Sequence, residues 1–205
     1  MDKIQSCQQC KRLHDNFRNL TNFYPNYHNR PVSGIGNKSS KICLIGLAPG
    51  LHGANKTGIP FMGDFSGDIL RTALTKNFLS TSNYKKNFNP IYITNTVKCY
   101  PPFNKPTSYE LNECINHLIN EVSILKKLKV IIALGFIAHN AVLDMFSLQK
   151  SKYKFKHKKK IWLDKKIILL DSYHCSKLNI NTKRLTIKQF VSIIAIAKEL
   201  AYGNK

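Results

Sequence analysis

Short apolar runs that alternate with helical patterns constrain the fold of this chain more than any other feature. Four such runs are candidates for buried strands: residues 41–47, 90–95, 130–134 and 167–170. Apolar residues at helical spacing predict helices over residues 4–20, from 66 onward, 107–128, 136–146 and 186–201. Strands that alternate with helices predict the α/β class: a three-layer α/β/α domain around a short, about four-stranded parallel central sheet.

The length suits one domain with a substantial core. The chain has 205 residues, and we expect residues 1–205 to form a single domain. No apolar run approaches the roughly 20 residues that a membrane helix needs. The first residues lack the basic start and apolar run of a signal peptide. We therefore expect a cytoplasmic monomer that has no membrane partner.

Charge indicates a polyanionic partner. Lysine and arginine number 32 against 11 acidic residues, which gives a net charge of +21. A field of this sign attracts nucleic acid or an anionic membrane surface. A bias toward AT-rich codons is an alternative, but it explains lysine in place of arginine rather than the shortage of acids. Residues 149–166 carry nine lysines and one acid. This segment is interpreted either as a solvated loop or as a segment that binds phosphates.

In parallel sheets the active site lies at the carboxyl ends of the strands. A glycine-rich loop, residues 46–68, follows the first strand, and it matches neither a P-loop nor a dinucleotide-binding fingerprint. Within it, Phe61 either stacks on a base or anchors the loop to the core. Asn95 ends the second strand, and its amide both donates and accepts, as reading a pyrimidine edge requires, although Asn here is more often a turn residue. His174 follows the fourth strand and precedes a basic loop.

Several spaced motifs, taken in order, resemble a uracil-DNA glycosylase. They are the loop 46–68, the segment 95–107, the run 133–139 and the segment 172–186. The best match is the iron–sulfur type called family 5, or type b, and it covers nearly the whole chain from Cys7 onward. This resemblance implies an α/β/α domain, excision of uracil from double- and single-stranded DNA, and a [4Fe–4S] cluster as cofactor.

The resemblance also implies the cluster ligands. Cys7, Cys10, Cys99 and Cys114 match the cluster positions of the family. Four thiolates also suit zinc, which is the alternative. A zinc ribbon normally shows two close cysteine pairs, whereas Cys99 and Cys114 are far apart, so the cluster is favoured. We expect it to tie the N-terminal helix to the loop after the second strand.

By the same resemblance, His174 faces uracil O2, Phe61 stacks on the flipped base and Asn95 faces the base edge. Ala48 stands where other families of this kind carry an acidic or amide side chain that activates water, and family 5 shares this alanine. The attacking water is then expected to be held by Asn55 or Asp64. The alternative for Asp64 is that it, or Asp68, caps the helix that starts near residue 66.

The loop after His174 is expected to contact DNA. Its candidate residues are Ser176, Lys177, Leu178, Asn179 and Arg184. A flipped base costs about a few kcal/mol of lost stacking, and Leu178 or Ile180 is a candidate wedge for the gap. Lys177, Lys183 and Arg184 are candidates for the flanking phosphates. Cys175 stands where the family usually has proline, which would stiffen the turn, so its loss bears on the rigidity of this loop.

Two other functions remain open from the sequence. Ala48 leaves a roomy pocket, which suits a glycosylase that acts mainly on hypoxanthine or xanthine. A DNA-binding protein that keeps the fold without catalysis is the second, because the basic charge predicts binding in either case.

Overall fold

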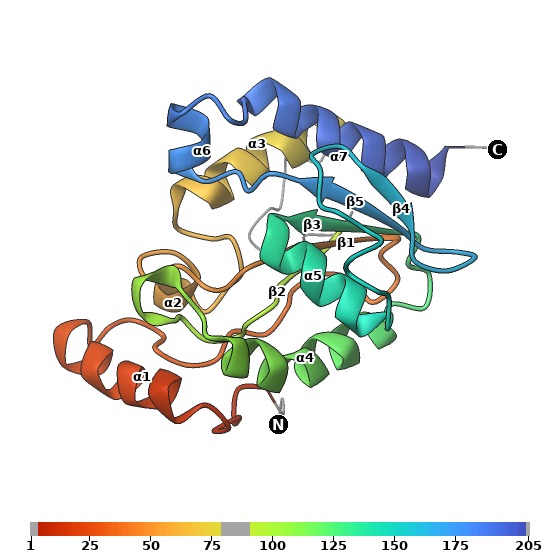
Figure 1. Ribbon diagram of the computed structural model, residues 1–205. Helices are drawn as coiled ribbons and strands as arrows, with labels where there is room; N and C mark the ends of the chain where they lie inside the picture. The colour runs from red at the N-terminus through yellow and green to blue at the C-terminus, as the bar shows by residue number, and fades with distance from the viewer. Residues whose placement is uncertain (1–3, 79–90, 204–205) are drawn as a thin grey trace.

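A twisted five-stranded sheet lies at the centre of the computed structural model, which describes residues 4–78 and 91–203 (Figure 1). Its strands are β1 (Ile42–Gly46), β2 (Tyr92–Asn95), β3 (Val130–Leu134), β4 (Lys160–Trp162) and β5 (Ile168–Ser172). Their order across the sheet is β2-β1-β3-β5-β4. The first four in that order run parallel, and β4 pairs antiparallel to β5. The predicted α/β class and four parallel strands are confirmed.

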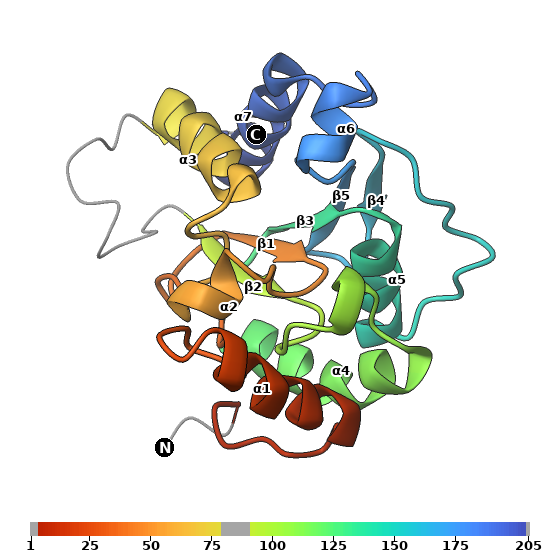
Figure 2. The same ribbon diagram turned by 90° about the vertical axis from the view of Figure 1, so that its left-hand side faces the viewer.

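Helices cover both faces of the sheet. On one face lie α3 (Phe65–Phe78) and α7 (Ile187–Tyr202), and on the other α4 (Ser108–Ser123) and α5 (Phe136–Met145) (Figure 2). Outside these layers are α1 (Lys11–Phe23), the short helices α2 (Ala54–Thr57) and α6 (Lys177–Asn181), and a 3-10 turn, η1 (Pro102–Asn104). None of the helices in the described part of the chain is long and apolar enough to cross a membrane.

Alternation along β1 shows why these apolar runs make a two-sided core. Ile42 and Leu44 pack with α3 and α7, whereas Cys43 and Ile45 pack with α4 and α5. All four side chains are fully buried. Successive side chains of a strand point to opposite faces, so a strand covered on both sides is apolar along most of its length.

Helix starts follow the capping rules. Thr107 accepts a hydrogen bond from the Glu110 backbone while the Glu110 carboxylate accepts one from the Thr107 backbone, which confirms the predicted capping box of α4. Thr186 and Gln189 form a second capping box at α7. Arg12 of α1 donates two hydrogen bonds, each 2.7 Å long, to the same Glu110 carboxylate. The cap of α4 therefore also holds α1.

Several predicted boundaries are wrong. The first helix begins at Lys11 rather than at residue 4, because residues 4–10 form a turn and an irregular segment that carry Cys7 and Cys10. Helix α4 ends at Ser123 rather than at 128; the apolar pattern continues because Leu125 and Leu128 are buried in the turn before β3. Residue 90, predicted to start a strand, lies outside the described residues.

Most of the lysine-rich segment is a loop, as the sequence suggested, but its residues 160–162 form the edge strand β4. From 152 to 158, exposed lysines alternate with the partly buried Tyr153, Phe155 and His157. The buried His139 holds this loop, with its Nε2 2.9 Å from the Tyr153 carbonyl and its Nδ1 2.8 Å from Asp171 Oδ1.

Candidate active site

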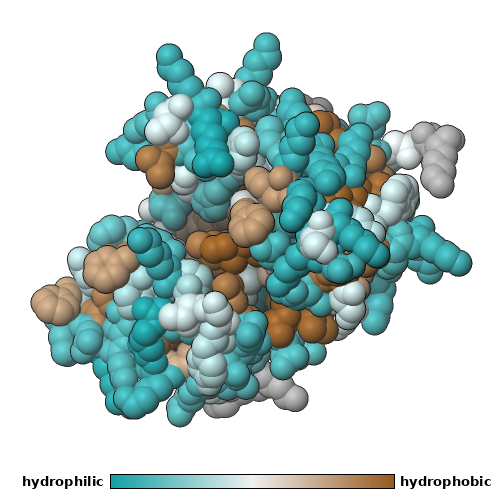
Figure 3. Space-filling model, viewed as in Figure 1, coloured by the Kyte–Doolittle hydropathy of each residue, from teal (hydrophilic) through white to brown (hydrophobic). Residues whose placement is uncertain are grey.

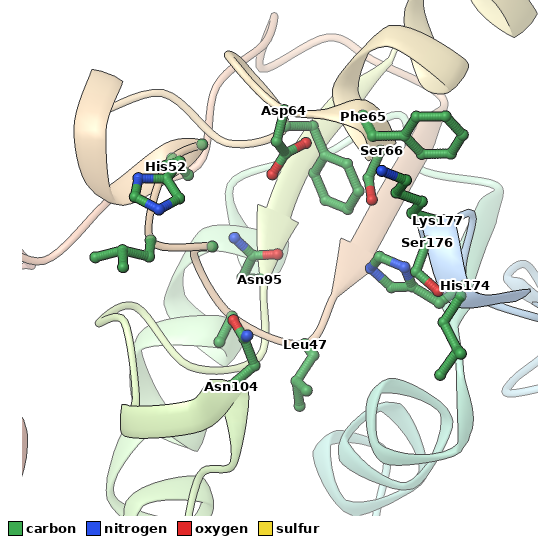
Figure 4. A pocket seen from close by; sticks show the side chains of 17 residues that line it. Leu47, His52, Asp64, Phe65, Ser66, Asn95, Asn104, His174, Ser176 and Lys177 are labelled. Atoms are coloured by element: carbon green, nitrogen blue, oxygen red, sulfur yellow. The ribbon is translucent and has the colours of Figure 1, made fainter.

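A cleft of about 600 Å³ opens at the carboxyl ends of β1 and β2. The loop after β1, the end of β2, η1 and the segment that leads into α6 line it (Figure 4). The molecular surface is hollowed between the α6 side and the α1–α2 side (Figure 3). This is the edge of the sheet where the sequence predicted a site.

Gly46, the last residue of β1, makes room for the floor of the cleft. A Cβ atom added there would lie 2.5 Å from Asn95 Oδ1 and 2.8 Å from the Phe61 ring. Any side chain at Gly46 would therefore displace both groups, which converge over the end of the sheet. Asn95 is almost fully buried, and its Oδ1 has no hydrogen-bond partner within the described structure.

Phe61 fills both roles that the sequence left open. Its side chain is only 8% exposed and belongs to the core between the sheet and α3 and α7. It also lines the cleft and stacks on His174, with ring centroids 6.0 Å apart. Its φ of +54° is a left-handed conformation that a bulky residue rarely adopts. Such strain is typical of functional loops.

His174 enters the cleft from the segment between β5 and α6. Its Nδ1 is buried and has no hydrogen-bond partner among the described residues. Burial lowers the pKa of His174 below its ordinary value of 6.5, while the nearby Asp64 carboxylate acts in the opposite direction. The imidazole is therefore neutral at pH 7, when one ring nitrogen donates a hydrogen bond and the other accepts one.

The backbone around His174 is held at two points. Asn179 donates a 2.8 Å hydrogen bond from Nδ2 to the His174 carbonyl. The neighbouring Cys175 is fully buried, and its thiol donates to the Ser66 carbonyl at the start of α3, 3.6 Å away. Cys175 thus ties the turn to α3 by a side-chain contact, a restraint that a proline at this position would not make.

Asp64 has two roles at once. Its Oδ1 accepts a 2.9 Å hydrogen bond from the Gly67 backbone, and this is the helix-capping role that was the alternative for Asp64. Its Oδ2 lies against Gly50 and Gly53, where glycine leaves space for it, and the residue lines the cleft. Asp68 does not cap the helix; it pairs with Arg71 on the surface.

Asn55, the other residue expected to hold water, does not line the cleft. It is fully buried in α2, and its Nδ2 donates a 2.9 Å hydrogen bond to Asn29 Oδ1. The polar lining residues that were missed include His52, whose Nδ1 lies 3.0 Å from the Tyr27 hydroxyl, and Asn104 of η1. Their signal was the position of both residues in loops that follow a strand's carboxyl end.

Residues expected to contact DNA divide into two groups. Ser176 caps α6 by accepting from the Asn179 backbone, and Asn179 holds His174, so both have structural contacts. Lys177 and Leu178 line the cleft, and Leu178 is 70% exposed. Ile180, the second wedge candidate, packs partly buried against the core instead.

Arg184 stacks on Tyr173 rather than extending freely. Its guanidinium carbon lies 4.6 Å from the centroid of the Tyr173 ring. On the same tyrosine, the His157 ring stacks at 5.1 Å and nearly parallel. This cation–aromatic stack joins the lysine-rich segment to the segment that carries His174.

Three of the four cysteines expected as metal ligands pack together. Cys10, Cys99 and Cys114 are buried in one apolar cluster with Leu13 and Phe17 of α1. Cys7 is partly exposed just before them and is close enough to raise the pKa of the Cys10 thiol electrostatically. Within residues 4–78 and 91–203, no three His, Cys, Asp or Glu side chains form a group that could hold a single metal ion.

Comparison with known proteins identifies the family. The model of the uracil DNA glycosylase superfamily matches residues 33–198, which include the whole sheet and every strand end that lines the cleft. The chain belongs to the uracil DNA glycosylase superfamily.

Relatives within this superfamily cover most of the chain. A type-5 uracil-DNA glycosylase of Thermus thermophilus is 41% identical over 180 residues, which are 85% of this chain and 82% of the relative. A type-5 uracil-DNA glycosylase of Pyrobaculum aerophilum is 32% identical over 95% of this chain and 88% of its own. A type-4 uracil-DNA glycosylase of Archaeoglobus fulgidus is 30% identical over 72% of this chain and 63% of its own.

The cysteines expected as cluster ligands supply four thiols, the number that a four-iron cluster takes. Burial raises the pKa of the Cys10 thiol to about 12, helped by Cys114 and other nearby acidic groups. The Lys98 backbone N–H lies 3.4 Å from Cys114 Sγ and donates to it. Such a donor stabilises a thiolate, as ligation to iron requires.

Proposed function

We propose that this protein excises uracil from double- and single-stranded DNA by hydrolysing the N-glycosidic bond, leaving an abasic site. Membership of the superfamily and the type-5 relatives support it. The observation that carries it is the convergence of Phe61, Asn95 and His174 in one cleft of about 600 Å³. An aromatic face, an amide and a neutral imidazole are the groups that a pyrimidine needs for stacking, edge recognition and charge stabilisation.

Charge separation during bond cleavage defines the role of His174. Breaking the C1′–N1 bond leaves positive charge on the sugar and negative charge on uracil, on its O2 side. A donor placed where this charge develops lowers the barrier because it binds the transition state better than the substrate. His174, neutral and held by Asn179 through its backbone, donates to O2 without needing a second proton.

The base is held by its face and its edge. Phe61 lines the cleft and supplies the aromatic ring for stacking, and Asn95 presents an amide from the end of β2. The unpartnered Asn95 Oδ1 supports this role, because a buried polar atom without a partner is costly unless a ligand satisfies it. Uracil N3–H and O4 are a donor and an acceptor that match this amide.

Water activation falls to Asp64. Ala48 lines the cleft but has no polar side-chain atom. Asp64 keeps one oxygen on the helix cap and has the other facing the cleft, so it can hold the attacking water without leaving its cap. We propose this role for Asp64 ahead of Asn55, which does not line the cleft, although its buried Oδ1 has no hydrogen-bond partner among the described residues.

DNA contacts follow from charge and exposure. Leu178 protrudes at the rim of the cleft and is the wedge that fills the gap left by the flipped base. Lys177 beside it and the net charge of +21 supply attraction to phosphates. Arg184, stacked on Tyr173, is available for a flanking phosphate in that orientation.

A [4Fe–4S] cluster on Cys7, Cys10, Cys99 and Cys114 completes the proposal. When bound, it supplies a covalent tie between α1, the segment after β2 and α4, whose other contacts include an apolar cluster, the Arg12–Glu110 pair and the hydrogen bond from Asn16 to the Tyr100 carbonyl. We assign it no step of the reaction. We further propose that the protein is a single-domain monomer of the cytoplasm.

One experiment tests the proposed function. Purified protein is incubated with matched duplexes that contain a single uracil, hypoxanthine or xanthine, and with the uracil single strand, and alkali then cleaves any abasic site. We expect strand breaks at uracil in both the duplex and the single strand. Cleavage at hypoxanthine or xanthine but not at uracil would reassign the substrate, and no cleavage despite DNA binding would indicate a non-catalytic protein.

A further inference from the structure

A lysine lies completely inside the protein beneath the cleft. Lys98 is 1% exposed, although lysine is among the residue types least often buried. Its Nζ donates three hydrogen bonds: to Thr94 Oγ1 at 2.7 Å, to the Asn95 carbonyl at 2.7 Å and to Glu121 Oε2 at 2.6 Å. All three protons of the ammonium group are used, so the lysine is part of a closed network.

The partner carboxylate is equally satisfied. Glu121 Oε2 also accepts from the Thr94 hydroxyl at 2.5 Å, and Oε1 accepts from the Gly34 backbone N–H at 2.5 Å. Glu121 lies on α4, which packs on the opposite side of β2 from α3. The network therefore joins three separate segments at the end of the edge strand: residues 34, 94–98 and 121.

The network fixes the peptide that carries Asn95. The carbonyl of Asn95 accepts from Lys98 Nζ, and the next amide, Thr96 N–H, donates to the Gly46 carbonyl at 2.8 Å. Both polar groups of the peptide bond between Asn95 and Thr96 are thus held. Because the direction of a side chain follows from its backbone, this peptide sets where the Asn95 amide points.

We infer that Lys98 and Glu121 are positioning residues that aim the Asn95 amide at the base edge in the cleft. This inference rests on the proposed function and assigns Lys98 no contact with substrate. A buried ion pair is weak evidence for a stabilising role, because apolar residues of similar size often serve stability equally well. What an apolar pair cannot supply is a donor to the Asn95 carbonyl.

Two variants separate positioning from stability. Lys98→Met alone leaves the buried Glu121 carboxylate unpaired and is expected to lower the melting temperature. The double variant Lys98→Met with Glu121→Gln has no buried charge, and the new amide can accept from the Gly34 backbone and donate to the Thr94 hydroxyl, which has lost its lysine donor. Its melting temperature therefore recovers toward that of the wild type. Its single-turnover rate on uracil duplex stays about tenfold to a hundredfold below wild type, since small misplacement of a substrate-holding group costs this much.

Coupling to Asn95 provides a measurement that a purely structural role would not change. We expect the Lys98→Met/Glu121→Gln pair to alter the rate by no more than about twofold when Asn95→Ala is already present, because residues that act through one another are not additive. The dissociation constant for uracil-containing duplex stays close to wild type throughout, as phosphate contacts supply most of the affinity.

Leu118→Ala is the matched control. Leu118 is fully buried one turn before Glu121 on α4 and lies outside the network. Its variant loses stability, but its rate per folded molecule stays within a few-fold of wild type. A double variant that regains both stability and rate, or one whose effect is unchanged in the Asn95→Ala background, overturns the inference. Failure of the proposed function looks different, because wild type and the Leu118→Ala control would then also leave uracil in place.

Discussion

The ring of His174 stacks on that of Phe61, with centroids 6.0 Å apart and planes inclined by 25°. The two residues come from segments more than a hundred positions apart, after β1 and after β5. Because Phe61 is anchored in the core, this contact restrains the position of the His174 ring. The donor and the stacking face for the base are therefore set relative to each other before any substrate enters.

Replacing His174 with alanine removes a donor aimed at charge that develops mainly in the transition state. We expect single-turnover excision to fall about 10²–10³-fold, as removal of one such donor typically does. Affinity for uracil-containing DNA should change far less. Rate and melting temperature are measured on the same preparation. His28→Ala, which removes an imidazole that does not line the cleft, is the control. A stable His174→Ala variant of near-normal rate contradicts the mechanism.

Asp64→Asn tests the proposed water-binding oxygen without removing the helix cap. Asparagine caps a helix about as well as aspartate, so we expect the melting temperature to change little. The excision rate should nevertheless fall at least about tenfold, within the range of general-base effects. Asp68→Asn, at a position that pairs on the surface, should leave the rate unchanged. Equal rates for wild type and Asp64→Asn would exclude the carboxylate from water activation.

The environment of His174 predicts the direction in which its pKa changes when Asp64 is replaced. Burial lowers this pKa below 6.5 and Asp64 partly opposes that, so Asp64→Asn should lower the pKa further. NMR titration of the His174 ring measures both values. Because the unfolded chain binds this proton more readily, the contribution of His174 to stability is complete above pH 6.5 and declines as the pH falls through and below that value. A pKa that rises in Asp64→Asn contradicts the assigned environment.

The lysine-rich segment predicts salt dependence. Replacing Lys156, Lys158, Lys159 and Lys160 with serine should flatten the fall of DNA affinity with salt, since each phosphate contact contributes to that slope. Single-turnover excision at saturating enzyme should stay near normal. The inward-facing Phe155 and His157 are left intact, so the segment keeps its contacts with Tyr173. An unchanged slope would show that these lysines only face solvent.

The four cysteines predict an iron–sulfur cofactor whose iron content can be measured. Anaerobically purified protein should be brown, with about four irons per chain. Cys99→Ala should lose iron and solubility, because Cys99 lies in the apolar cluster that holds α1 against the segment after β2. Cys43→Ala, which removes a thiol of β1 that is buried between the sheet and α4 and α5 and lies outside the cysteine group, should keep its iron. Stoichiometric zinc without iron in the anaerobic preparation would overturn the cluster.

Periodicity and end signals in the sequence were enough to determine the layered sheet. Each parallel strand is covered on both faces, so most of its residues are apolar, and this makes runs such as 130–134 visible without a structure. The capping box of Thr107 and Glu110 was equally local and equally visible. Strand β4 was missed because it lies at the sheet edge, where only Ile161 of its three residues is buried.

Site residues at strand ends could be predicted because parallel strands bring their carboxyl ends to one edge. Phe61, Asp64, Asn95 and His174 all line the cleft for this reason. Asn55 could not be separated from Asp64 by sequence, since nine residues of a turning loop place one inside the protein and the other at the cleft. The role of Lys98 could not be predicted either, because nothing in the sequence distinguishes it from the many exposed lysines of a chain with net charge +21.

Local patterns thus determined which segments form strands, where helices begin and which loops meet at the site. Only the tertiary structure decided what each side chain does there: that Phe61 serves both core and cleft, that Asp64 caps with one oxygen and faces the cleft with the other, and that Lys98 lies beneath Asn95. The physical reason is that periodicity reflects burial against a whole layer, whereas a role in a site depends on contacts between segments far apart in the chain.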